Sequence, residues 1–219
     1  MKIIGVSGSP SPNSNTDRAV KAVLESTGME TEFIKLSHYK YEPCRACLKC
    51  TSTNVCVIKD DANELVQKVK DADALVVGGF VPYSSLDGRT KSFLERLYCL
   101  RHQKGLMRGK PGGIVITSAV PQQEPYPPIA EVGVAAVKAY MNAEGMNVVG
   151  DVKIFGTATC AKCGYGNECE LSGIKGIFGP DATVEGVGCP RFEDQPETLK
   201  AAQELGEKIA QELRKDSDE

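Results

Sequence analysis

Short apolar runs alternate along the chain with longer stretches of helical spacing. Runs of strand length, bounded by glycine, serine or charged residues, occupy residues 2–8, 31–36, 74–80, 112–118 and 147–155. Apolar side chains recur every three or four positions over residues 16–26, 88–102, 129–144 and 195–214. A further helix, which carries Leu65, Val66 and Val69, is predicted to begin after Asp60 or Asp61. Each predicted strand is thus followed by a helix.

This order predicts an α/β fold with a doubly wound, five-stranded parallel sheet. Right-handed crossovers from strand to helix to strand place helices on both faces of such a sheet. No repeat or linker divides the chain, so we expect one domain over residues 1–219. The loops that follow the strands should share the carboxyl edge of the sheet, where this class of fold binds ligands. In the helix at 129–144, the side chains expected to be buried are Ile129, Val132, Ala136, Val137 and Tyr140.

The balance of charge gives no reason to expect a nucleic acid or an anionic membrane as a partner. The net charge is −3, and nowhere do eighteen apolar residues follow one another. The first apolar run, at residues 3–6, is too short for the core of a signal peptide. We therefore expect a cytoplasmic protein, in which thiols stay reduced.

The stretch EPCRACLKCTSTNVCV at residues 42–57 holds four of the nine cysteines, Cys44, Cys47, Cys50 and Cys56. In a reducing compartment, close-set cysteines favour metal or redox chemistry over disulfides. The pattern C-x2-C-x2-C-x5-C lets a short loop wrap four thiolates around an iron–sulfur cluster. Structural zinc more often uses two C-x2-C pairs separated by a long spacer. The spacing favours iron–sulfur, while zinc and free or disulfide-bonded thiols stay open as alternatives.

A polar loop joins the first predicted strand to the first helix. Residues 8–16, GSPSPNSNT, offer hydroxyl groups, an amide side chain and the backbone N–H groups at the start of a helix, which together suit a phosphate. The loop has no lysine and is neither the GxxxxGK[ST] nor the GxGxxG phosphate motif. A monophosphate such as that of FMN fits it better than a triphosphate or a dinucleotide. The alternative is a helix cap with a Ser/Pro turn and no ligand.

These motifs resemble those of the iron–sulfur flavoproteins, within the NADPH-dependent FMN reductase group of flavodoxin-like proteins. The resemblance rests on SGSPSPNSNT at residues 7–16, on the first cysteine motif and on the run of strands. It implies a flavodoxin-like, three-layer α/β/α fold that holds FMN and one [4Fe–4S] cluster. The implied cluster ligands are Cys44, Cys47, Cys50 and Cys56, and the implied phosphate contacts are Ser9, Ser11, Ser14, Asn15 and Thr16. The segments implied to line the flavin ring are Phe80, Val81, Pro82, Tyr83, Ser84 and Ser85, and Thr117, Ser118 and Ala119.

The two implied cofactors lead to a function. We expect an oxidoreductase that exchanges electrons between a one-electron carrier such as ferredoxin and FMN, with both cofactors at one edge of the sheet. Because the redox chemistry belongs to the cofactors, no catalytic side chain is predicted. The resemblance also implies a homodimer or homotetramer.

Two other functions stay open. Residues 80–82 read Phe-Val-Pro where the family usually has Pro-Val-Tyr, which would suit a zinc-stabilised binding module with a degenerate flavin site. The other alternative is an NAD(P)H-dependent flavin or quinone reductase with structural metal.

A second cysteine-rich segment follows the fifth predicted strand. Residues 156–190 are rich in glycine, so we expect irregular structure there, and the resemblance does not explain them. The first cysteine group and this segment form insertions at about 37–58 and 156–190. Cys160 and Cys163 form a C-x2-C pair, to which Cys169 and Cys189 add two thiols. We hypothesise a second metal site, either iron–sulfur or zinc, while a loop with scattered thiols is the alternative.

Overall fold

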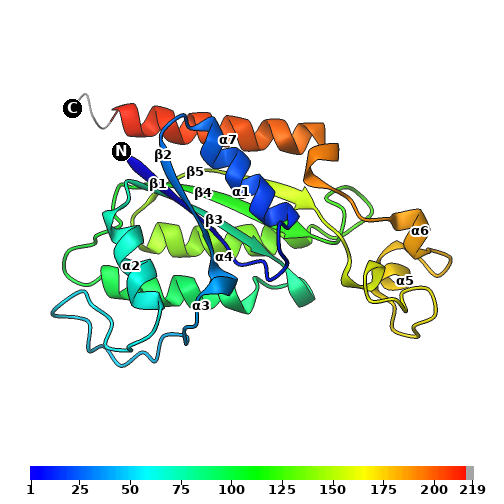
Figure 1. The fold of residues 1–219 in the computed structure, drawn as a ribbon, viewed down its shortest axis with the longest axis horizontal. Coiled ribbons are helices and arrows are strands. Elements are labelled where there is room, and N and C mark those ends of the chain that lie inside the picture. Colours follow the sequence, from blue (N-terminus) through cyan, green and yellow to red (C-terminus); the bar gives the residue numbers. More distant parts are fainter. Residues whose placement is uncertain (216–219) are drawn as a thin grey trace.

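The computed structural model describes residues 1–215 and contains one sheet of five parallel strands (Figure 1). The strands are β1 (Lys2–Ser7), β2 (Glu30–Lys35), β3 (Ala74–Phe80), β4 (Pro111–Ser118) and β5 (Asn147–Phe155). Their order in the sheet is β2-β1-β3-β4-β5, and every neighbouring pair is parallel. This is the strand order of flavodoxin-like proteins. The predicted doubly wound α/β fold is therefore confirmed.

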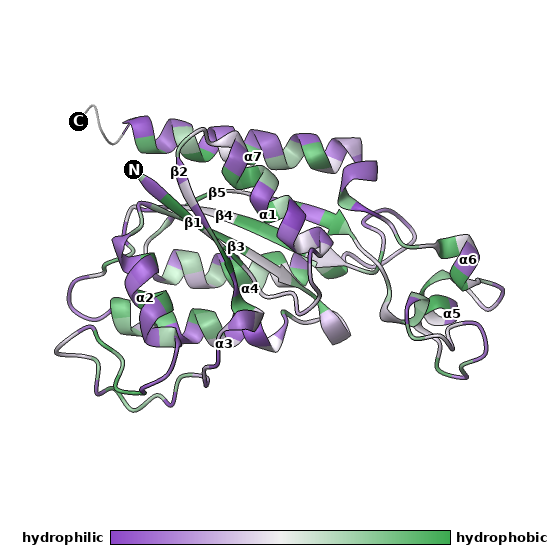
Figure 2. Cartoon of the chain, in the orientation of Figure 1, coloured by the Kyte–Doolittle hydropathy of each residue, from purple (hydrophilic) through white to green (hydrophobic). Residues whose placement is uncertain are grey.

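Five main helices cover the two faces of the sheet and complete three layers (Figure 1). The helices α1 (Asn15–Ser26) and α7 (Pro196–Lys215) pack on one face, and α2 (Ala62–Asp71), α3 (Gly88–Arg96) and α4 (Ile129–Ala143) pack on the other. Each face has its own apolar core, and Figure 2 shows the apolar residues on the strands and on the inner sides of the helices. Burial of these two cores is the main force that holds the layers together.

The helices α1 and α7 approach each other closely at one glycine. A Cβ atom added to Gly206 of α7 would lie 2.2 Å from the backbone oxygen of Val23 in α1. A backbone atom cannot move away as the end of a flexible side chain can. Only glycine therefore allows this contact between the two helices.

Two predicted helices differ from those in the structure. The helix expected at 88–102 ends at Arg96 and continues as a tighter 3₁₀ turn, η3 (Leu97–Leu100). In α4, the prediction that Val132 is buried is wrong, because its side chain is 45% exposed. Gly133 faces the sheet instead, and a Cβ atom there would meet Ile116 and Val81. The close approach at this glycine turns the buried face of α4 toward Ala130, Gly133, Val134, Val137 and Met141.

The two insertions leave the sheet at different places (Figure 1). Residues 39–61 form a long loop that runs beneath α3 and returns to α2, and we call it the cysteine loop. Residues 156–194 lie beyond the carboxyl edge of the sheet, and we call them the second insertion. The second insertion is less irregular than expected, since it contains the short helices α5 (Gly173–Phe178) and α6 (Val184–Val187).

Candidate functional site

A buried ion pair anchors the polar loop between β1 and α1, residues 8–16. Asp17 and Lys35 are 2% and 8% exposed, and Lys35 Nζ lies 2.6 Å from a carboxylate oxygen of Asp17. The same ammonium donates to the backbone oxygen of Ser11 at 2.7 Å. Ser14 completes a capping box, because its hydroxyl accepts from Asp17 N at 3.1 Å and its own N–H donates to Asp17 Oδ2 at 3.0 Å. These bonds fix the loop before any ligand binds.

On the side that faces the pocket, the loop has hydrogen-bond donors that are free for a ligand. The hydroxyl groups of Ser9 and Ser11 have no hydrogen-bond partner among residues 1–215, and the amides that begin α1 face the same space. Thr16 Oγ1 lies 2.8 Å from Thr117 Oγ1, which joins the loop to the end of β4. The resulting pocket, which we call the phosphate pocket, has a volume of about 470 Å³. Hydroxyl groups and a helix N-terminus form a donor set that fits a phosphate monoester such as that of FMN.

Seven of the predicted flavin contacts line this pocket together. They are Ser9, Ser11, Ser14, Asn15, Thr16, Phe80 and Thr117. The remaining predicted ring contacts, Val81, Pro82, Tyr83, Ser84, Ser85, Ser118 and Ala119, do not line it. Tyr83 is fully exposed and has a φ of +50°, so the turn after β3 points this ring into solvent. The ring contacts of these residues stay predictions.

Outside the loop itself, five polar residues of the pocket were not predicted from the sequence: Arg18, Thr157, Thr159, Lys162 and Arg191. Arg18 lies four residues after Ser14, so its helical position could have revealed it. The other four belong to the second insertion, which has no periodicity that could place it against the loop. Asn15 also has an unpredicted role, because its amide bonds the backbone at Pro190 and Phe192.

The base of the cysteine loop is held by a buried arginine. The side chain of Arg96 in α3 is 0% exposed, and its NH1 lies 2.5 Å from Asp60 Oδ2 and 3.0 Å from the backbone oxygen of Glu42. NH2 donates to the backbone oxygen of Ile58 at 3.4 Å. Glu42 precedes the cysteines, and Ile58 and Asp60 follow them. Arg96 therefore ties the two arms of the loop together.

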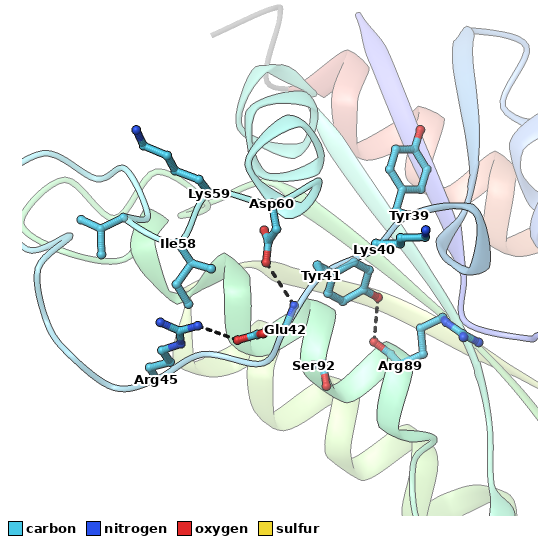
Figure 3. A pocket seen from close by; sticks show the side chains of 11 residues that line it. Tyr39, Lys40, Tyr41, Glu42, Arg45, Ile58, Lys59, Asp60, Arg89 and Ser92 are labelled. Carbon is cyan, nitrogen blue, oxygen red and sulfur yellow. Dashed lines mark hydrogen bonds and ion pairs between the residues drawn. The ribbon is translucent and has the colours of Figure 1, made fainter.

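A polar cavity of about 790 Å³ lies between these two arms (Figure 3). Tyr41 donates to the backbone oxygen of Arg89 at 3.0 Å, and Glu42 N donates to Asp60 at 3.1 Å. Arg45 and Glu42 form an exposed ion pair at its rim. These bonds join the two arms to each other and to α3, and so orient the loop that carries the cysteines.

The far end of the cysteine loop is anchored to the segment after α3. Asn54 Nδ2 donates to the backbone oxygens of Cys99 at 2.9 Å and His102 at 2.7 Å. Cys99 is 2% exposed, as expected for a small apolar residue. Burial raises the pKa of Cys99 to about 11, and the charges of Cys56 and Cys50 contribute to the rise. Two of the predicted cluster ligands thus lie beside Cys99.

The four cysteines of the loop fit a metal by their chemistry. Burial raises the pKa of Cys50, and the charges of Cys56, Cys44 and Cys47 raise it further, so these three sulfurs lie within electrostatic reach of Cys50. Within residues 1–215, no three Cys, His, Asp or Glu side chains form a group that could hold a metal ion. Thiolate is the ligand that binds an iron–sulfur cluster, whose positive core would offset the repulsion among these sulfurs. The ligand assignment stays a prediction.

Residues 8–16, which we call the phosphate loop, lie at the start of α3, whereas Cys50 and Cys56 of the cysteine loop lie near its far end. The start of α3 packs on the phosphate loop, because a Cβ atom on Gly8 would lie 1.8 Å from Thr90 Oγ1. The nine residues of α3 and the four of η3 span about 20 Å along their axis. Cys50 and Cys56 lie beside Cys99, near the far end of this span. The cysteine loop is thus long enough to run back along the helix, and the expectation that both cofactors share one edge stays a prediction.

The four cysteines of the second insertion are not brought together as one group. Cys160 Sγ accepts from Gly173 N at 3.1 Å, and Cys163 Sγ accepts from Tyr165 N at 3.4 Å. Cys169 is exposed, and Cys189 lines the phosphate pocket. The second metal site stays a prediction.

Comparison with known proteins decides the family. Residues 1–125 match the NADPH-dependent FMN reductase family. The chain belongs to it. It is 30% identical over 162 residues to the iron–sulfur flavoprotein of Methanosarcina thermophila, a match that covers 73% of this chain and 82% of that protein. The predicted resemblance to the iron–sulfur flavoproteins, within the NADPH-dependent FMN reductase group, is thus confirmed.

Two further comparisons agree with this assignment. An iron–sulfur flavoprotein of Methanocaldococcus jannaschii is 38% identical over 122 residues, which cover 54% of this chain and 63% of that protein. The solved structure of a flavodoxin from the domain Archaea is 16% identical, with a TM-score of 0.53 over 98% of this chain and 99% of that one. At this low identity, the second comparison supports the fold alone. Among residues 1–215, no helix has the length and apolar character needed to cross a membrane.

Proposed function

We propose that this protein is an electron-transfer oxidoreductase that uses FMN and a [4Fe–4S] cluster to exchange electrons with a ferredoxin-like carrier. The observation that carries the proposal is a four-cysteine loop on the same chain as the pocket of an FMN reductase. A cubane cluster supplies single electrons and FMN supplies one or two, so the pair can connect one-electron and two-electron chemistry. The names of the iron–sulfur flavoproteins that the chain matches support this reading.

The side chains have distinct roles in this proposal. Ser9, Ser11, Ser14 and Thr16 hold the FMN phosphate, with the buried Lys35 keeping the loop in place. The cluster ligands are Cys44, Cys47, Cys50 and Cys56. None of these residues transfers a proton. Their work is to bind and orient the two cofactors.

We infer that electrons pass between subunits rather than within one chain. Support comes from the length of α3 and η3, about 20 Å, because the phosphate loop contacts the start of this span and Cys50 and Cys56 lie near its end. A neighbouring copy can bring its cysteine loop closer to the flavin than the chain's own loop lies. This arrangement requires a homodimer or homotetramer, which we propose for the cytoplasmic protein.

Electron exchange with a carrier tests the function. Anaerobic protein is mixed with reduced ferredoxin in a stopped-flow instrument while the flavin absorbance is recorded. The wild type should lose its flavin colour rapidly, and Cys47→Ala should lose it far more slowly although it still contains FMN. Equal rates in the two proteins would refute the role of the cluster.

A reductase that takes electrons from NADPH is the second candidate, because the matched family is described by that activity. Under anaerobic conditions, NADPH would then bleach the flavin in the wild type and in Cys47→Ala at the same rate. A flavin that does not react with NADPH would exclude this candidate.

A further inference from the structure

The phosphate pocket has two walls, and only one of them comes from the part of the chain that matches the FMN reductase family. Residues 9–16 form the first wall, while Lys162, Arg191 and their neighbours in the second insertion form the other. We propose that Lys162 and Arg191 bind the phosphate of FMN, so that the second insertion completes the cofactor site. The proposal rests on FMN occupying this pocket, as in the proposed function.

The second wall is fixed in place by direct contacts with α1. Asn15 Nδ2 donates to the backbone oxygen of Pro190 at 2.8 Å, and Asn15 Oδ1 accepts from Phe192 N at 3.2 Å. Next to it, Arg18 Nε lies 2.5 Å from a carboxylate oxygen of Glu193. Phe192 is 2% exposed and belongs to the apolar core between α1, α7 and the sheet. A segment with a buried aromatic anchor and three polar contacts stays against the pocket.

The charge of the pocket points to an anion. The residues that line it include three cations, Arg18, Lys162 and Arg191, and no Asp or Glu, although the net charge of the whole chain is −3. A phosphate monoester carries a charge between about −1.5 and −2 near pH 7, because its second pKa is about 6. The phosphate loop itself contains neither lysine nor arginine. Any cation that neutralises the phosphate therefore comes from outside the loop.

Lys162 and Arg191 are better placed for this role than Arg18. Arg18 is engaged with the backbone of Asn13, the side chain of Asn15 and Glu193. Lys162 has no ion-pair partner among residues 1–215, and Arg191 has only Glu193, at 3.6 Å. Both side chains are exposed and can move toward a bound phosphate without leaving a buried charge unpaired.

Riboflavin provides the control ligand, because it has the ring and the ribityl chain of FMN but no phosphate. We measure the dissociation constants of FMN and riboflavin by flavin fluorescence quenching with the apoprotein of the full chain. Charge-assisted hydrogen bonds predict that Lys162→Gln and Arg191→Gln each weaken FMN binding about tenfold. Riboflavin binding should change less than twofold, and the FMN affinity of the double variant should depend less steeply on salt.

Lys175→Gln is the matched control variant, since this lysine lies in the same insertion but does not line the pocket. Its affinity for FMN should equal that of the wild type. FMN binding of the double variant within twofold of the wild type would overturn the inference while leaving the proposed function intact. An equal loss of FMN and riboflavin binding would also overturn it, because the two cations would then act on the fold of the pocket. Wild-type protein that binds neither flavin would refute the flavin site and this inference together.

Discussion

Replacing Arg96 by methionine removes the buried cation that ties the arms of the cysteine loop. The methionine fills part of the same volume but leaves Asp60 without its partner at 2.5 Å. It also removes the donors to the backbone oxygens of Glu42 and Ile58. The fold of α3 should persist, because the apolar face of this helix does not change. The cysteine loop should lose its fixed base.

The expected loss of stability follows from the burial of the pair. Removing one partner of a buried ion pair costs about 3–5 kcal/mol. The side chain of Asp60 is 14% exposed, so water can solvate part of its charge and the lower end, about 3 kcal/mol, applies. This is a large share of the roughly 5–15 kcal/mol by which domains are stable. Arg96→Met combined with Asp60→Asn should recover part of the loss, because it removes the unpaired charge.

Urea denaturation, followed by far-ultraviolet circular dichroism, measures the free energy of unfolding. Lys200→Met in α7 serves as the control, because Lys200 and its partner Glu204 at 3.7 Å are 71% and 49% exposed, so the loss of this pair should cost at most about 1 kcal/mol. Iron content after anaerobic reconstitution should fall in Arg96→Met and not in Lys200→Met. An Arg96→Met protein within about 1 kcal/mol of the wild type, with full iron content, would refute the reasoning.

Three further predictions concern other contacts of the fold. Gly206→Ala should lower the free energy of unfolding by about 1–3 kcal/mol through overlap with Val23, and an unchanged or raised urea midpoint would contradict this. Asn15→Ala should speed trypsin cleavage after Arg191, because the hydrogen bonds of Asn15 to the backbone of Pro190 and Phe192 are lost. An unchanged cleavage rate on gels would show that these two bonds do not hold the segment. Burial tends to raise the pKa of Asp60, but bonds from Arg96 and Glu42 outweigh it and lower the pKa. The stabilisation by Asp60 is therefore complete above its unfolded pKa of about 4 and is lost as the pH falls through the lower folded value. Urea midpoints of Asp60→Asn should show less of this acid dependence, and identical pH profiles would refute it.

Hydrophobic periodicity was sufficient to predict the layers of the fold. The strands at 74–80 and 147–155 have the predicted bounds, since buried strands between turn residues leave a clear pattern. Periodicity failed at one helix face, where Val132 is exposed and Gly133 packs on the sheet. A glycine carries no apolar signal, although its small size lets the backbone approach.

The paths of the two insertions could not be predicted from the sequence. The direction of the cysteine loop depends on Arg96 and Asn54, which bond partners 33 to 54 positions away. The second insertion meets the phosphate loop through Asn15 and Phe192, 177 positions apart. Single polar contacts of this kind leave no periodic pattern in the sequence. The motifs could therefore suggest ligands for FMN and a cluster, but not the other half of the pocket.

Cofactor content tests the central claim most directly. Iron, zinc, acid-labile sulfide and FMN are measured per chain in anaerobically purified wild type and in Cys47→Ala. The account predicts about four irons and one FMN per chain in the wild type, and FMN with little iron in the variant, because a [4Fe–4S] cluster needs four cysteine ligands. Wild-type protein that contains zinc in place of iron, or that lacks FMN, would contradict the account.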